Sequence, residues 1–204
     1  MKNSYPLALL TAVLTVVAWS AISPFDRLTW WLEVAPALAG LIALAVQWRR
    51  FRFTDLVLTF IALHMILLCV GGHYTYALVP IGDWVKDALH LSRNHYDRLG
   101  HLAQGFVPAL IARELLIRLK VVACPGWRRF FIVCIAMTIS AVYEIIEWIT
   151  ALLAGEASDS FLGTQGDVWD TQTDMALALA GAVIALLVFA RWHDRQLGRG
   201  NVES

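Results

Sequence analysis

The sequence predicts an all-α fold, a polytopic membrane bundle of six transmembrane helices with both termini in the cytoplasm. Of the 204 residues, 59% are hydrophobic and 16% are charged, and the mean hydropathy is +0.63. A soluble domain of this composition would expose too much apolar surface to water. The apolar residues also fall into six runs of membrane-spanning length, and lysine and arginine are distributed unequally between the loops.

The six runs match the length of a membrane crossing, because a hydrocarbon core about 30 Å thick needs ~20 apolar helical residues. They are 6–22, 30–48, 55–78, 98–119, 129–153 and 171–190. The first run lacks a convincing small-x-small cleavage site, so we expect a retained helix and not a signal peptide. The stretch 79–94 is too polar to cross and predicts a short interfacial segment between the third and fourth spans. No stretch is long enough for a second domain, so we expect residues 1–204 to form a single transmembrane domain.

The orientation follows from the basic residues, which favour cytoplasmic loops. With the N-terminus inside, twelve of the 16 lysines and arginines lie on the cytoplasmic side, and only Arg27, Lys86, Arg93 and Arg98 lie outside. No basic stripe accompanies this distribution, so we expect no nucleic-acid binding. The three cysteines lack the paired spacing of a zinc or redox motif and are expected to be small apolar side chains.

Ionisable residues gather where the predicted topology places the periplasmic ends of four spans. A charged side chain at the centre of a span costs ~2.5–3.5 kcal/mol on insertion scales, so such residues normally face a cavity or a partner. The charge argument for topology did not require them to gather, so their common depth independently indicates a site. The residues are His73 in the third span, Asp97, Arg98 and His101 in the fourth, Glu144 and Glu147 in the fifth, and Asp170 and Asp174 in the sixth.

Their spacing predicts that each pair projects from one helical face. Asp97 and His101 are four residues apart, as are Asp170 and Asp174, and Glu144 and Glu147 are three apart. Carboxylates gathered at low dielectric must be protonated, paired or bound to a cation. We therefore predict a divalent metal: Zn, Mn or Fe for carboxylates with imidazole, or Mg for oxygen ligands alone. The candidate ligands are His73, Asp97, His101, Glu144, Glu147, Asp170 and Asp174.

Other interpretations of the same residues stay open. The carboxylates could form a structural hydrogen-bond network that fastens the helices together, and Glu147 could extend toward the headgroups beside Trp148. Arg98 could pair with a site carboxylate or hold a phosphate headgroup. His193 has no partner that the sequence identifies and is expected to be solvated. Gly181 and the neighbouring alanines predict close helix packing.

Three strings carry a resemblance that covers nearly the whole chain. They are His95-Tyr96-Asp97-Arg98-x-Gly100-His101, Tyr143-Glu144-x-x-Glu147-Trp148 and Gly163-Thr164-Gln165-Gly166-Asp167-x-Trp169-Asp170-Thr171-Gln172-x-Asp174-Met175. With these strings the chain resembles the YjdF-like bacterial inner-membrane proteins, a family of unknown function. The resemblance implies a multi-pass protein of the inner membrane.

A more distant likeness is to VanZ-like membrane proteins, which are associated with teicoplanin resistance. Asp97, Arg98 and His101 match the first string of that pattern, and Glu144 matches the start of the second. Glu147 stands where the pattern has Gln, and Asp174 stands where it has Asn. Both departures add negative charge, which favours a bound cation in this chain.

Three functions fit these residues. The first is a metal-dependent hydrolase at the outer leaflet that acts on a lipid or lipid-linked substrate, with Asp97, Arg98, Glu144 and Glu147 as the catalytic residues. The second is a non-catalytic scaffold or envelope-stress factor that depends on the loop 79–94. The third is a small cation- or proton-coupled transporter, which would need a polar route to the cytoplasm. The partners expected are the bilayer and its lipids, and the oligomeric state is left open.

Overall fold

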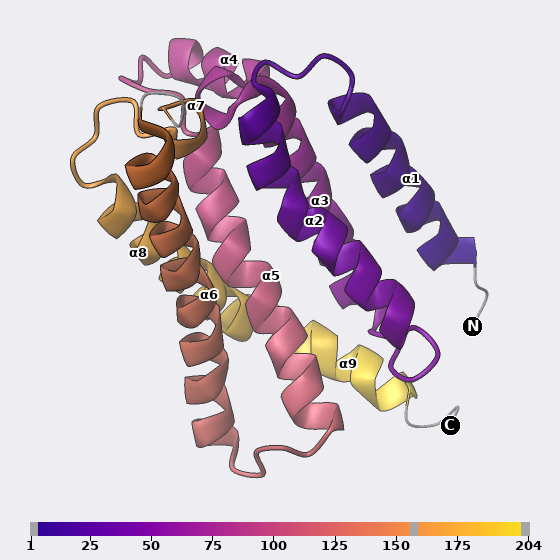
Figure 1. The fold of residues 1–204 in the computed structure, drawn as a ribbon. Helices are drawn as coiled ribbons and strands as arrows, with labels where there is room; N and C mark the ends of the chain where they lie inside the picture. Colours follow the sequence, from indigo (N-terminus) through magenta and orange to yellow (C-terminus); the bar gives the residue numbers. More distant parts are fainter. Residues whose placement is uncertain (1–3, 156–158, 201–204) are drawn as a thin grey trace.

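A computed structural model describes residues 4–155 and 159–200, and every regular element within them is helical (Figure 1). The long helices of this described part are α1 (Ser4–Ser20), α2 (Arg27–Gln47), α3 (Asp55–Tyr74), α5 (Tyr96–Arg118), α6 (Pro125–Ala154) and α8 (Asp170–Val188). At one end lie the short helices η1 (Tyr76–Leu78), α4 (Pro80–Ala88) and α7 (Asp159–Leu162), and at the other lies α9 (Ala190–Gly200). We refer to these as the α4 end and the α9 end.

Four of the long helices, α2, α3, α6 and α8, are long and apolar enough to cross a membrane. α1 is apolar but has only 17 residues. α5 has 23 residues but carries acidic and basic side chains along its length. The third apolar run was expected to reach residue 78, whereas α3 ends at Tyr74 because Thr75 adopts a φ of 61°.

Local sequence signals explain several helix starts. The Asp26 side chain accepts a 2.7 Å hydrogen bond from the Thr29 N–H at the start of α2, and this bond lowers the pKa of Asp26. Thr54 caps α3 in the same way. Pro80 and Pro125 occupy the first turns of α4 and α6, where a missing N–H costs nothing.

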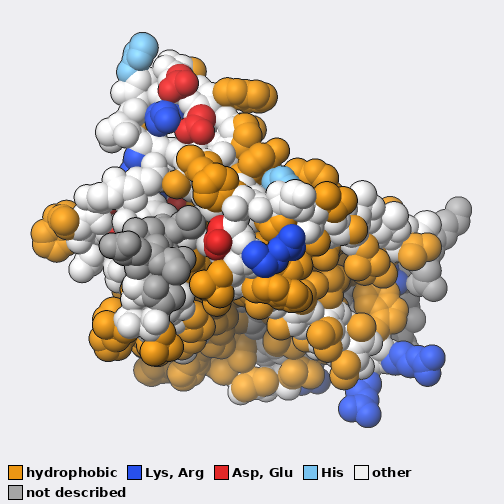
Figure 2. All heavy atoms as spheres, turned by 45° about the horizontal axis from the view of Figure 1, so that its top comes forward, with side chains coloured by type: hydrophobic (Ala, Val, Ile, Leu, Met, Phe, Trp, Pro, Cys, Tyr) orange, Lys and Arg blue, Asp and Glu red, His pale blue; other side chains and the backbone are white. Residues whose placement is uncertain are grey.

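The stretch 79–94, which was expected to be interfacial, contains the short helix α4. This helix is amphipathic, with Ile81, Trp84 and Val85 exposed along it. Large hydrophobic side chains also cover the flank of the bundle, while charged side chains gather toward its ends (Figure 2). This distribution suits a protein whose flank is surrounded by lipid.

α5 is the central helix of the bundle and packs most extensively on α8, with α6 and α3 on its other sides. Glycines allow the close approach of α5 to α8. A Cβ at Gly105 would collide with the Ala178 carbonyl oxygen, and one at Gly181 would collide with the Leu102 carbonyl oxygen. The predicted close packing at Gly181 is therefore confirmed, and it brings the α4 ends of α5 and α8 together.

Candidate metal centre

Four buried ionisable side chains from three helices meet at the α4 end. They are Asp97 and His101 from α5, Glu144 from α6 and Asp174 from α8, and none is more than 7% exposed. We call them the acid–histidine cluster. His101 Nε2 lies 3.5 Å from Asp97 Oδ1 and 3.9 Å from Asp174 Oδ2, and its Nδ1 lies 3.6 Å from Glu144 Oε1. The imidazole is therefore the centre around which the three carboxylates are arranged.

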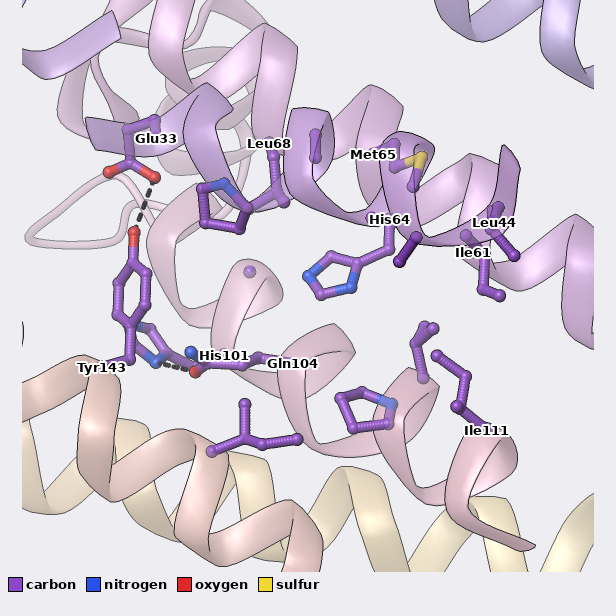
Figure 3. Close-up of a pocket in the computed structure, with 18 of the residues that line it drawn as sticks. Glu33, Leu44, Ile61, His64, Met65, Leu68, His101, Gln104, Ile111 and Tyr143 are labelled. Atoms are coloured by element: carbon purple, nitrogen blue, oxygen red, sulfur yellow. Dashed lines mark hydrogen bonds between the residues drawn. The ribbon is translucent and has the colours of Figure 1, made fainter. Parts of the chain in front are cut away.

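Gln104 orients that imidazole. It follows His101 by three residues on α5, and its Oε1 lies 2.9 Å from His101 Nδ1 (Figure 3). An amide oxygen can only accept, so Nδ1–H is the donor and the lone pair of the neutral ring belongs to Nε2. Nε2 is the nitrogen nearest to Asp97 and Asp174. A metal-binding histidine commonly has this arrangement, because the second nitrogen donates to a neighbouring oxygen.

The cluster also contains oxygens that lack a donor. Within the described residues, Asp97 Oδ2, Glu144 Oε1 and Asp174 Oδ1 are buried without a hydrogen-bond partner. A buried carboxylate oxygen without a donor, proton or cation is costly. One ligand atom from each of Asp97, His101 and Asp174 lies within 4.8 Å of the other two. A single divalent cation between these three residues would satisfy the carboxylates of Asp97 and Asp174.

Glu33 on α2 adds an acid that the sequence analysis missed. It is 3% exposed, and its Oε2 accepts a 3.0 Å hydrogen bond from the Tyr143 hydroxyl (Figure 3). Glu33 and Glu147 line the same cavity as Asp97 and His101. Glu147 thus faces the interior, whereas the neighbouring Trp148 is 62% exposed. This placement does not favour the alternative in which Glu147 extends toward the headgroups. A single acid in the apolar run 30–48 was the available signal for Glu33, but its partner is 110 residues away.

An arginine layer covers the cluster. Arg93 is buried, and its guanidinium lies 2.6 Å from Asp170 Oδ1, 3.4 Å from Asp167 Oδ2 and 3.9 Å from Asp97 Oδ2. Asp170 is thus paired with Arg93, so its prediction as a metal ligand is not supported by the geometry. Arg93 was predicted only to be a basic residue outside the membrane, although its i,i+4 spacing to Asp97 is evident in the sequence.

Arg98 also belongs to this layer and not to the cluster. Its guanidinium lies 2.7 Å from Asp167 Oδ2 and 3.2 Å from His95 Nδ1. A hydrogen bond from the Trp169 N–H, with the positive charges of Arg98 and Arg93, lowers the pKa of Asp167. Arg98 therefore pairs with a carboxylate, as expected. That carboxylate is Asp167 in the loop before α8, and it is not a member of the acid–histidine cluster.

That loop is clamped to the start of α5. Gln165 Oε1 accepts from the Asn94 N–H at 3.0 Å, and Gln165 Nε2 donates to the Asn94 carbonyl at 2.9 Å. Gly163, Gln165 and Gly166 all have positive φ, at 59°, 49° and 82°. A positive φ is strained for a residue that has a Cβ, and glycine occupies two of these three positions. The first half of the third family-like string, residues 163–170, therefore forms a cover above the acid–histidine cluster, to which Asp174 near the end of the string belongs.

His73 does not join the cluster, and its prediction as a ligand is not supported. Its ring packs on Trp19 with 4.3 Å between centroids, and Nδ1 lies 3.1 Å from the Ser20 carbonyl oxygen. The preceding Gly72 faces Glu33 and Val34 on α2. The next side chain on a helix points about 100° away, and this turns His73 toward α1.

A second buried polar network lies at the α9 end. His193 is fully buried, and its Nε2 lies 3.1 Å from Glu114 Oε2. Glu114 also accepts hydrogen bonds from the backbone N–H and hydroxyl of Thr54. The expectation that His193 is solvated was wrong, because α9 folds back and places this residue against α5.

Comparison with known proteins agrees with the membrane fold. The family described as "Predicted membrane protein (DUF2238)" matches residues 5–195. The chain is 50% identical to the Inner membrane protein YjdF of Escherichia coli (strain K12) over 197 residues, which are 95% of this chain and 94% of that protein. No solved structure matches the chain. These matches confirm the YjdF-like resemblance and give no support to the more distant VanZ likeness.

Proposed function

The chain belongs to the DUF2238 family of membrane proteins and lies in the inner membrane, and we propose that its acid–histidine cluster binds one divalent cation for hydrolysis of a lipid or lipid-linked substrate. The observation that carries this proposal is the convergence of Asp97, His101 and Asp174 within 4.8 Å, with carboxylate oxygens that have no hydrogen-bond partner among the described residues. Two helices that are far apart along the chain supply these residues, α5 with Asp97 and His101 and α8 with Asp174, each from its α4 end.

The topology proposed is six crossings in a single transmembrane domain, with both termini in the cytoplasm. Four helices meet the length and apolarity of a span. α1 supplies a fifth, and α5 a sixth, whose polar side chains are tolerated because they face protein neighbours and not lipid. The start of α1 points toward the α9 end, where α9 itself lies (Figure 1). Since most basic residues lie there too, the α4 end is assigned to the periplasm.

His101 Nε2 and one oxygen each from Asp97 and Asp174 would hold the proposed cation. Glu144 completes the coordination or stays free as a base. A mixed set of one imidazole and several carboxylates favours Zn, Mn or Fe over Mg, which prefers oxygen ligands alone. A second divalent ion is not required by the residues described.

The proposed chemistry is hydrolysis of an ester or phosphoester. A cation held at this site would lower the pKa of a bound water. A carboxylate, Glu144 or Glu147, would take a proton from the water as its oxygen bonds to the carbonyl carbon or phosphorus. The same carboxylate would then return that proton to the leaving oxygen as its bond to carbon or phosphorus breaks. Arg98 and Arg93, above the cluster, supply positive charge toward an anionic headgroup.

A cation- or proton-coupled transporter is the second candidate, favoured by one observation. The Glu114–His193 pair gives the α9 end a buried polar network of its own, as a transport route requires. Cation flux into proteoliposomes tests this candidate. Flux that is lost in a His193→Ala variant would favour transport over hydrolysis.

The proposal is tested by elemental analysis of tag-free, detergent-purified protein. The wild type is expected to carry one stoichiometric transition metal, and the Asp174→Asn variant to lose it. The control is Asp55→Asn, which removes a carboxylate paired with Arg52 near the α9 end and should retain the metal. Wild-type protein that holds no metal, even after incubation with Zn²⁺ or Mn²⁺, would contradict the proposal.

A further inference from the structure

A long cavity runs from the acid–histidine cluster into the interior of the membrane-embedded bundle. It has a volume of about 430 Å³ and lies between α2, α3, α5 and α6. Its polar end is lined by Glu33, Asp97, His101 and Glu147. Beyond Gln104 the walls become apolar, with Leu44, Ile61, Met65 and Ile111 facing the space (Figure 3). The cavity thus has a polar head and an apolar body.

The cavity is as long as a lipid chain requires. Along α2 its lining residues recur at helical spacing from Glu33 to Gln47, a distance of ~21 Å at ~1.5 Å per residue. On the opposite wall they run along α5 from Asp97 to Leu115. A hydrocarbon core is about 30 Å thick, so one leaflet supplies about half of that depth. The cavity is therefore long enough to hold the hydrocarbon chain of a lipid from one leaflet.

The cavity also has a side opening toward lipid. α2 packs mainly on α3, whereas α6 packs mainly on α5 and α8. The hydrogen bond between Glu33 and Tyr143 joins α2 to α6 at the polar end of the cavity, and the opening lies beyond it. Ala43 on α2 and Ile139 on α6 line the cavity and are also exposed on the flank of the bundle. An opening at this depth faces acyl chains and no water.

We propose that this cavity is the binding groove for one hydrocarbon chain of an anionic membrane lipid, which enters sideways between α2 and α6. The lipid headgroup then lies against the acid–histidine cluster and its cation. This assignment rests on the proposed function, since the cation is what offsets the carboxylates and accepts an anionic headgroup.

One polar side chain within the apolar body supports an occupant. Figure 3 shows the His64 imidazole pointing into the groove from α3. Its Nε2 is buried and has no hydrogen-bond partner among the described residues. An unpartnered buried nitrogen is costly, and an ester oxygen at the start of the bound acyl chain, about one turn of α3 from Leu68, would offset that cost.

Photo-crosslinking in vesicles of phosphatidylethanolamine and phosphatidylglycerol tests the proposal. Two phosphatidylglycerol probes carry a diazirine on one acyl chain, either beside the ester or at the chain tip. After illumination, the modified residues are mapped by peptide mass spectrometry. We expect the ester-side probe to label the region of Leu68 and Gln104, and the tip probe to label Ile61 or Ile111.

A matched pair of variants on α2 makes the test specific. Ala43 lines the groove, whereas Ala39, one turn away, is exposed on the flank and does not line it. Ala43→Trp should reduce groove labelling to background, and Ala39→Trp should leave it unchanged. Labelling confined to outward residues such as Leu153 and Leu187, or groove labelling that survives Ala43→Trp, would overturn the proposal.

Metal content measured on the same samples separates this inference from the cation site. If the wild type holds metal but its groove is not labelled, the lipid-groove proposal is overturned and the cation site is kept. If the groove is labelled in protein that binds no metal, the lipid-groove proposal is supported and the cation-site proposal is rejected. Ala43→Trp protein that keeps its metal while losing the label shows that the variant is folded, and it supports the groove directly.

Discussion

His101 Nδ1 lies 2.9 Å from the Gln104 side-chain oxygen, and this contact turns the Nε2 lone pair toward Asp97 and Asp174. The orientation of the only imidazole in the acid–histidine cluster is therefore set by an amide one turn away on the same helix. If the cluster holds a cation, Gln104 is a positioning residue that does not itself touch the metal.

Replacing Gln104 by Leu should weaken the cation site. Loss of such an outer partner typically lowers metal affinity 10–100-fold, a range we expect here in order of magnitude. Zn²⁺ titration against a competing chelator measures the change. Gln104→Glu should restore affinity because a carboxylate also accepts from Nδ1–H, and equal affinity of wild type and Gln104→Leu would refute the positioning role.

Arg93→Gln should destabilise the protein strongly. Arg93 is buried against Asp170, Asp167 and Asp97, and removing one partner of a buried ion pair typically costs about 3–5 kcal/mol. Arg52→Gln is the control, because its pair with Asp55 is partly exposed and exposed pairs contribute about 0–1 kcal/mol. Thermal unfolding followed by tryptophan fluorescence in detergent compares them. Equal midpoints for the two variants would contradict the buried arginine layer.

The glycine contact between α5 and α8 gives a packing prediction. Gly105→Ala should force these helices apart at the Ala178 carbonyl oxygen, at a cost of about 1–3 kcal/mol typical of overpacking. The cluster spans the same pair of helices, so metal retention should fall as well. Gly126 has nothing within 4 Å of an added Cβ, and Gly126→Ala should leave both properties unchanged. A Gly105→Ala protein with wild-type midpoint and metal content would refute the close approach.

Asp167 predicts a pH dependence in the cover over the cluster. Its pKa is lowered by the Trp169 N–H and by Arg98 and Arg93, so its contribution to stability is present above the unfolded-state pKa of about 3.9. The contribution is lost as the pH falls through the folded-state pKa. The difference in melting temperature between wild type and Asp167→Asn should thus be present at neutral pH and should disappear at acidic pH. A difference that stays constant between neutral and acidic pH would count against this assignment.

The sequence predicted much of the cluster because helical spacing is local. Asp97 and His101 share a face of α5, and positive-inside counting placed that face at the same depth as Glu144 and Asp174. These inferences need only a helix period and a membrane depth. The structure brings all four side chains together.

The residues that sequence reasoning missed depend on contacts between distant segments. Glu33 pairs with Tyr143 across 110 residues, and Arg93 pairs with Asp170 across 77. His193 was assigned to solvent because nothing in its neighbourhood reveals that α9 folds back onto Glu114. Residues 98–119 were expected to cross the membrane, but α5 is not among the four helices that are apolar enough to do so, because it carries polar side chains that face protein neighbours.

X-ray absorption at the metal edge of tag-free, Zn²⁺-loaded protein tests the central claim most directly. We expect a first shell of one nitrogen and several oxygens at ~2.0–2.2 Å, with the imidazole signal lost in His101→Ala and kept in His73→Ala. A shell that contains sulfur or several imidazoles, or a spectrum that His101→Ala leaves unchanged, would contradict a cation held by the acid–histidine cluster.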